Sequence, residues 1–116
     1  MRTTDNKTVN KKAKDPFDAL IFEKGLRMKF IDIHKEVDLM LVVLNNGKVL
    51  KLRLSDYPKL KKANKTQLNN WKLISGGIGI SWEGINEDLS VKGFIKDAAL
   101  NTMLHNLLGA EENAVA

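Results

Sequence analysis

The dipeptide Asn46-Gly47 constrains the fold of this chain more than any other feature, because it lies between two apolar runs. A two-residue hairpin loop of type I′ requires positive φ at both central residues, and Asn followed by Gly adopts that conformation most readily. The sequence therefore predicts a hairpin with Asn46 and Gly47 as its whole loop. In that register one face of the hairpin is wholly apolar. Its cross-strand pairs are Leu39–Leu54, Leu41–Leu52 and Val43–Leu50.

Five strands are predicted from the alternation of apolar and polar residues and from the turn signals between them. Three of them cover residues 27–34, 37–44 and 48–54. The strand over 37–44 is apolar on both faces and should be central, whereas the strand over 48–54 carries Lys51 and Arg53 on its second face. Two further strands, in "WKLIS" and "GIGISW", should be joined around Gly76-Gly77.

Short helices are predicted near residue 16, where Asp15 is a cap and Pro16 fits the first helical position, and again within residues 55–71. A last helix should begin at Asp97 and end at Gly109. Its apolar residues recur at i, i+3, i+4, i+7 and i+8, which is the pattern of a single helix face. They are Leu100, Met103, Leu104, Leu107 and Leu108.

This apolar stripe is expected to complete the core, which is the usual role of an amphipathic helix. The alternative is that the stripe lies across a partner groove or a dimer axis. On that alternative Leu100, Met103, Leu104 and Leu107 are the candidate partner-binding residues.

Together these elements predict an α+β fold: a mostly antiparallel sheet of four or five strands with an N-terminal hairpin, short connecting helices and a C-terminal amphipathic helix. Residues 15–109 should form a single domain, flanked by a disordered basic tail over 1–14 and a frayed end over 110–116. The chain has no cysteine, which excludes disulfides and thiolate metal sites and suits the cytoplasm. No apolar run approaches the roughly 20 residues that span a bilayer, so we expect no membrane partner.

The net charge of +5 is concentrated in residues 1–14 and 48–65. Such asymmetry suits an anionic partner, although lysines on a short helix also simply keep a small protein in solution. The candidate anion-binding residues are Lys51, Arg53, Lys59, Lys61 and Lys62. Only Tyr57 is an aromatic residue interleaved with them, so the sequence predicts no stacking platform for single-stranded nucleic acid.

No residue is predicted to be catalytic, to bind a cofactor or to ligate a metal. His34 and His105 have no neighbour at metal-ligand spacing. The glycines of "SGGIGIS" lead into a strand rather than a helix, so they indicate a turn and not a phosphate loop. In "ISWEGINEDLSVKGF", Trp82 should be buried, and Glu87 and Asp88 should precede a helix start, where the helix dipole favours negative charge.

Two stretches together resemble the bacterial family named domain of unknown function 2442. They are "MKFIDIHKEVDLMLVVLNNGKVLKLRLSDYPKL" and "NNWKLISGGIGISWEGINEDLSVKGFI". The residues that carry the family signature are Trp82, Glu87, Asp88, Leu89 and Ser90. This chain departs from the pattern at Asn86, where an aspartate is common, and at Phe94-Ile95, which replace paired leucines.

The resemblance implies a compact α+β module with no established enzymatic activity. It also implies that the gene lies next to one that encodes another small protein, in what looks like a toxin-antitoxin arrangement. We therefore expect a non-catalytic binding or regulatory protein, and more specifically the antitoxin-like member of a gene pair. It should contact another small protein or a second copy of itself. The alternative is a nucleic-acid-associated accessory protein that uses its basic hairpin face and tail.

Overall fold

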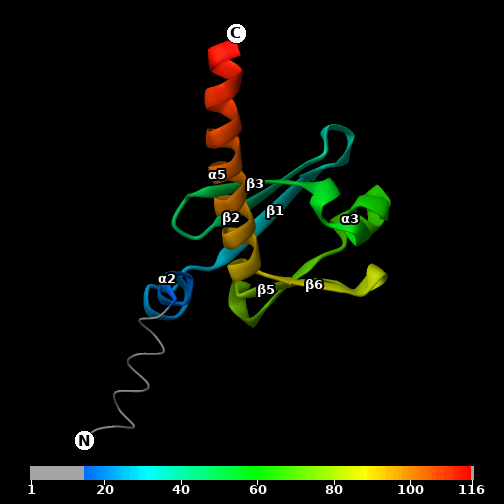
Figure 1. Ribbon diagram of the computed structural model, residues 1–116. Coiled ribbons are helices and arrows are strands. Elements are labelled where there is room, and N and C mark those ends of the chain that lie inside the picture. The colour runs from blue at the N-terminus through cyan, green and yellow to red at the C-terminus, as the bar shows by residue number, and fades with distance from the viewer. Residues whose placement is uncertain (1–14, 116) are drawn as a thin grey trace, which may run out of the picture.

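The computed structural model describes the backbone of residues 15–115 and the side chains of residues 15–108. The expected basic tail over residues 1–14 lies outside the described residues, as do the side chains of the expected frayed end. The described chain contains two three-stranded antiparallel sheets and a long C-terminal helix (Figure 1). The α+β class is therefore confirmed, whereas the expectation of one sheet with four or five strands is wrong.

The first sheet is formed by β1 (Met28–His34), β2 (Leu39–Leu44) and β3 (Val49–Arg53), with β2 in the centre as predicted. The predicted hairpin register is wrong by one residue, because Val43 pairs with Val49 rather than with Leu50. The loop contains three residues, Asn45, Asn46 and Gly47, and the Gly47 N–H donates to the Leu44 carbonyl oxygen at 3.1 Å. Met40, Val42 and Leu44 consequently face the core.

Asn45 belongs to the loop because it is bonded to the segment before β1. Its backbone N–H donates to the Arg27 carbonyl oxygen at 2.9 Å, and its side-chain Oδ1 accepts from the Arg27 N–H at 3.0 Å. Its Nδ2 donates to the Gly25 carbonyl oxygen at 2.9 Å. Gly47 then supplies the positive φ of 86° that closes a three-residue loop.

The second sheet is formed by β4 (Lys72–Ile74), β5 (Gly79–Trp82) and β6 (Glu87–Ser90). The predicted turn around Gly76-Gly77 is confirmed, as the 3₁₀ turn η4 (Ser75–Gly77). Gly77 has a φ of 111° and lies against the backbone of Met28, so a side chain there would overlap the Met28 carbonyl oxygen. This glycine therefore brings the second sheet against β1.

Short helical elements precede β1 and connect the strands. They are α2 (Pro16–Asp18), η1 (Ala19–Glu23), η2 (Lys35–Val37), η3 (Leu54–Asp56), α3 (Pro58–Lys62), α4 (Lys65–Asn69) and η5 (Glu83–Ile85). The predicted Asp15 cap is confirmed, because its carboxylate accepts from the Phe17 N–H at 2.9 Å. Three of these elements, η3, α3 and α4, lie between β3 and β4. The helix α5 (Val91–Val115) packs against β3. β4 therefore does not continue the first sheet and starts a separate one.

The core lies where the two sheets, α3, α4 and the start of α5 meet. Trp82 is buried, as predicted, and is the largest fully buried side chain of this core; its Nε1 donates to the Leu68 carbonyl oxygen at 3.0 Å. This bond joins the end of α4 to β5 without leaving a buried indole N–H unpaired. Among the described residues, no helix is long and apolar enough to cross a bilayer.

Candidate functional site

The helix α5 enters the core with its first two turns. It starts at Val91 rather than at the predicted Asp97, because the Ser90 Oγ accepts from the Gly93 N–H at 3.0 Å and so caps the N-terminus. Val91, Phe94 and Ile95 are buried, and Ala98 packs against the same core. The helix also continues to Val115, past the predicted end at Gly109.

The predicted apolar stripe lies on the other side of this helix, in solvent. Leu100 follows Val91 by nine residues and Leu104 follows Ile95 by nine. At 3.6 residues per turn this spacing rotates a side chain by about 180°. The exposed fractions are Leu100 50%, Met103 55%, Leu104 48%, Leu107 65% and Leu108 57%. The expectation that these residues complete the core is wrong, and we name them the α5 stripe.

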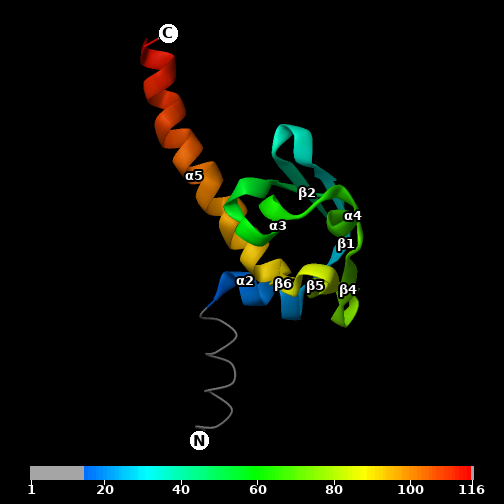
Figure 2. The same ribbon diagram turned by 90° about the vertical axis from the view of Figure 1, so that its right-hand side faces the viewer.

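The part of α5 that carries the stripe projects from the body of the protein. Figures 1 and 2 show the C-terminal half of the helix leaving the two sheets. Within residues 15–108, Ala98 is the last apolar residue of α5 that packs against the core. Because the stability of a protein helix comes mostly from packing of its apolar face, this half of α5 lacks its usual support in the monomer.

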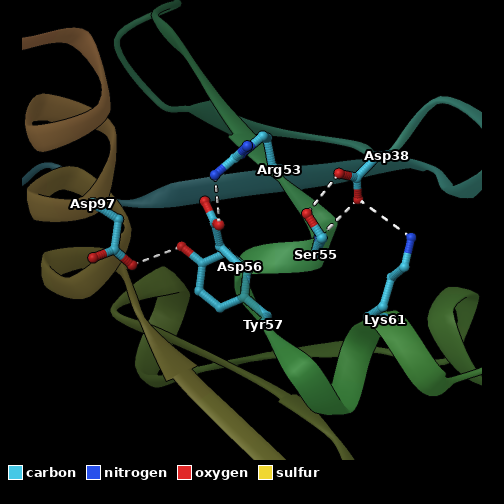
Figure 3. A network of polar contacts seen from close by, with 7 residues as sticks. All are labelled: Asp38, Arg53, Ser55, Asp56, Tyr57, Lys61 and Asp97. Atoms are coloured by element: carbon cyan, nitrogen blue, oxygen red, sulfur yellow. Dashed lines mark hydrogen bonds and ion pairs between the residues drawn. The ribbon is translucent and has the colours of Figure 1, made fainter. Parts of the chain in front are cut away.

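Ion pairs and a buried tyrosine fix the direction in which α5 leaves the body. The Lys92 Nζ lies 2.6 Å from the Asp15 carboxylate and 2.9 Å from the Asp18 carboxylate. Hydrogen bonds to these two aspartates raise the pKa of Lys92, and the bond from Lys92 lowers the pKa of Asp15. The Tyr57 hydroxyl donates to Asp97 at 2.7 Å, as Figure 3 shows.

Most of the candidate anion-binding residues are engaged within the chain. The Arg53 guanidinium lies 3.0 Å from Asp56, and the Lys59 Nζ donates to the Asn86 carbonyl oxygen at 2.9 Å. Lys61 lies 4.0 Å from Asp38 (Figure 3). The five residues are also divided between two elements. Lys51 and Arg53 belong to β3, whereas Lys59, Lys61 and Lys62 belong to α3.

Asp38 joins the first sheet to the segment that follows it. Its two carboxylate oxygens accept from the Ser55 N–H at 2.7 Å and from the Ser55 Oγ at 2.6 Å (Figure 3). These bonds, with the nearby charge of Lys61, hold the pKa of Asp38 below its usual value. Asp38 also has a φ of 55°, a left-handed conformation that Asp and Asn tolerate better than most residues. The network ties the end of η2 to the start of η3.

Of the family-signature residues, one lies in the core and three line a groove. Trp82 is in the core, and Glu87 and Asp88 begin β6, the strand that leads directly into α5 at Val91, so they precede a helix start as predicted. A groove of about 350 Å³ lies between β6, α5 and Tyr57. The residues that line it are Tyr57, Asp88, Leu89, Ser90, Gly93, Phe94 and Asp97.

The hydroxyl groups of this groove are already bonded. The Ser90 Oγ accepts from Gly93, and the Tyr57 hydroxyl donates to Asp97. Burial, the hydrogen bond to Asp97 and its charge raise the pKa of Tyr57, so the phenol stays protonated and cannot serve as a base near neutral pH. Neither Glu83 nor Glu87 lines the groove, and Glu83 instead pairs with Lys72 at 2.6 Å.

No metal-binding cluster is present in the described residues, where no three His, Asp or Glu side chains gather. The His34 Nε2 lies at hydrogen-bond distance, 2.9 Å, from the Asp32 carboxylate on its own strand. His105 is exposed on α5.

The outer face of the first sheet carries an aromatic residue that the sequence analysis missed. Phe30 is 51% exposed and lies edge-on to Trp71, with ring centroids 5.6 Å apart. Its cross-strand row continues through Val43 to Val49, and Lys51 lies two residues along on the same face of β3. An irregularity in the register between Met28 and Phe30 turns Phe30 outward, and no local pattern signals it.

Comparison with known proteins gives a family and a fold. The chain matches the family described as protein of unknown function (DUF2442) over residues 31–99. A crystal structure of a protein of unknown function from Rhodospirillum rubrum ATCC 11170 has a TM-score of 0.54 and 24% identity, and the match covers 61% of this chain and 86% of that one. The solution NMR structure of an uncharacterised protein from Chromobacterium violaceum has a TM-score of 0.58 and 19% identity, covering 84% of this chain and 85% of that one.

At these identities the two structures establish the fold alone. None of the curated proteins matches the sequence. The family match, in contrast, spans more than half of the chain and includes β2, both sheets' hairpins and the core-facing turns of α5. The chain therefore belongs to the DUF2442 family.

Proposed function

We propose that the chain is a non-catalytic, cytoplasmic protein-binding module that docks on a partner protein through the α5 stripe. The observation that carries the proposal is the exposure of five large apolar side chains on the side of α5 that faces away from the core. Contiguous exposed apolar surface of this kind marks protein interaction sites in soluble domains. An amphipathic helix that lays its apolar face on a partner is a recurring mode of recognition.

The stripe offers part of the free energy that specific binding needs. Full burial of a Leu or Met side chain contributes roughly 1.5–3 kcal/mol, so five half-exposed residues offer about 4–8 kcal/mol from this chain alone. The partner's own apolar surface adds to that figure, and the entropy lost on association subtracts from it. The more specific proposal, that the chain is an antitoxin-like member of a gene pair, depends on the family resemblance alone. The first experiment therefore tests whether the chain binds another protein.

The experiment is co-purification with a matched pair of variants. A tagged chain is expressed together with its neighbouring reading frames, and every protein present in stoichiometric amount is identified and then purified separately. Leu104→Asp places a charge in the stripe and should abolish rebinding of that protein. Thr102→Asp places the same charge on an exposed position at the opposite side of the helix and should leave rebinding unchanged. Equal binding by both variants would refute the role of the stripe.

A second candidate function is binding of single-stranded nucleic acid to the outer face of the first sheet. The specific observation is that Phe30, edge-on to Trp71, shares this face with the cationic Lys51. Stacking of a base on an aromatic side chain contributes about 1–3 kcal/mol, and a neighbouring cation adds a salt-dependent term.

This candidate is tested with labelled single-stranded oligonucleotides of mixed sequence at low salt. Phe30→Ala should weaken binding by roughly 5- to 150-fold, which is the ratio that a loss of 1–3 kcal/mol gives. Lys51→Ala should weaken it and reduce its salt dependence, whereas Lys62→Ala, on α3, should change little. Absence of binding at low salt would rule this candidate out.

A further inference from the structure

We propose that the α5 stripe binds a second copy of this chain, with the two helices antiparallel and in contact along Leu100, Met103, Leu104 and Leu107. This inference rests on the proposed function, because it names the occupant of the same surface. The chemistry, the symmetry and the position of the stripe each favour this occupant.

The chemistry of the stripe favours an identical apolar surface over a charged partner. Residues 98–108 contain no Lys, Arg, Asp or Glu, and the one ionisable residue among them, His105, lies outside the stripe. A partner recognised by charge would bury its charge here without an opposite charge to pair with it, which is costly. A second copy brings only Leu and Met side chains and buries no charge.

The spacing of the stripe meets the requirement of a two-fold contact. In a symmetric dimer the same patch must be complementary to itself. The positions i, i+3, i+4 and i+7 read the same in both directions along a helix. A two-fold axis between Met103 and Leu104 therefore places Leu100 against the partner's Leu107, and Met103 against the partner's Leu104.

The projection of α5 leaves room for the antiparallel arrangement. The helix continues past Ala98, its last core-packed apolar residue among those described, and the proposed axis separates the two bodies by about 11 residues of helix, or roughly 16 Å at 1.5 Å per residue. In an antiparallel pair the two bodies lie at opposite ends of the shared helical segment. A parallel pair would instead bring the two bodies side by side. The projecting half of each helix would also gain the packing that it lacks in the monomer.

The size of the contact predicts a weak and reversible dimer. Each copy contributes four half-exposed side chains over less than two heptads, which is shorter than the three to four heptads typical of stable coiled coils. The interface therefore falls in the smallest size class, below about 1,200 Å². We expect a dissociation constant on the order of 1–100 µM.

Sedimentation velocity of the full chain, from about 1 to about 500 µM, brackets the expected dissociation constant. The wild-type chain should change from monomer to dimer across this range. Leu104→Asp should remain monomeric throughout, and Thr102→Asp should dimerise as the wild type does. A wild-type chain that is monomeric at the highest concentration overturns the inference.

Disulfide trapping tests the orientation, because the chain has no cysteine of its own. Met103→Cys lies beside the two-fold axis and should form a disulfide dimer under mild oxidation. Leu100→Cys should not cross-link to itself, because the two copies of that position lie about 10 Å apart along the helix axis. It should cross-link when mixed with Leu107→Cys. Efficient self-linking of Leu100→Cys would indicate parallel helices and overturn the antiparallel arrangement.

The two proposals fail in different ways. A monomeric chain that still binds another protein through Leu104 overturns the second-copy inference and leaves the proposed function standing. A monomeric chain with no binding that depends on Leu104 overturns both.

Discussion

Phe94→Ala and Leu104→Ala test whether α5 has one apolar face for its own core and another for a partner. The Phe94 side chain is 1% exposed and packs edge-on against Tyr57, with ring centroids 5.7 Å apart. Its truncation leaves a cavity and should reduce the free energy of unfolding by about 3–5 kcal/mol. Leu104 is 48% exposed, and Leu and Ala have similar helix propensities. Its truncation should change the free energy of unfolding of the monomer by no more than about 0.5 kcal/mol.

Urea denaturation followed by tryptophan fluorescence measures both effects, because Trp82 is fully buried and reports loss of the core. The protein concentration must lie below the dimer dissociation constant, so that only the monomer contributes. At higher concentration the difference between the wild type and Leu104→Ala should grow, since a second copy that binds only the folded state stabilises it by mass action. A cost above about 2 kcal/mol for Leu104→Ala at low concentration would refute the assignment of the two faces, because it would place Leu104 in the core.

Further substitutions test individual contacts. Gly77→Ala should destabilise the fold by about 1–3 kcal/mol in thermal or urea unfolding, because Gly77 has positive φ and lies against Met28, whereas Gly84→Ala, which meets open space, should be nearly neutral. Tyr57→Phe should cost about 1–2 kcal/mol through loss of the bond to Asp97, and an unchanged unfolding midpoint would argue against that bond. The pKa of Asp38 is lowered from 3.8 in the folded state, so its contribution to stability is present at neutral pH and is lost as the pH falls below 3.8 through the native value. Acid unfolding of Asp38→Asn should therefore depend less on pH than that of the wild type, and identical acid transitions would contradict this.

Local patterns predicted the elements of this fold better than their assembly. The alternation in residues 37–44 identified a central strand, and Asp15 with Pro16 identified a helix start, because both signals are contained in a few neighbouring residues. The hairpin register was missed because it depends on bonds from Asn45 to residues that precede β1. Such a contact between distant segments leaves no periodic signal in the strand itself.

The division into two sheets and the location of the α5 stripe were also not predictable from the sequence. Nothing in residues 54–71 alone shows that β4 begins a new sheet. The stripe was correctly identified as one helix face, but its burial depends on where the helix starts. Once α5 begins at Val91, the buried turns orient the face that carries Leu100 and Leu104 toward solvent. The candidate partner-binding residues thus came from the sequence, whereas their exposure came only from the structure.

Amide hydrogen exchange of residues 99–108, measured at low and at high protein concentration, tests the central claim most directly. The projecting half of α5 lacks core contacts, so its amides should exchange rapidly in the monomer. At concentrations above the dimer dissociation constant they should become protected, while protection of the core-packed turn around Phe94 should change far less. Equal and strong protection of residues 99–108 at every concentration, or none at any concentration, would contradict the account.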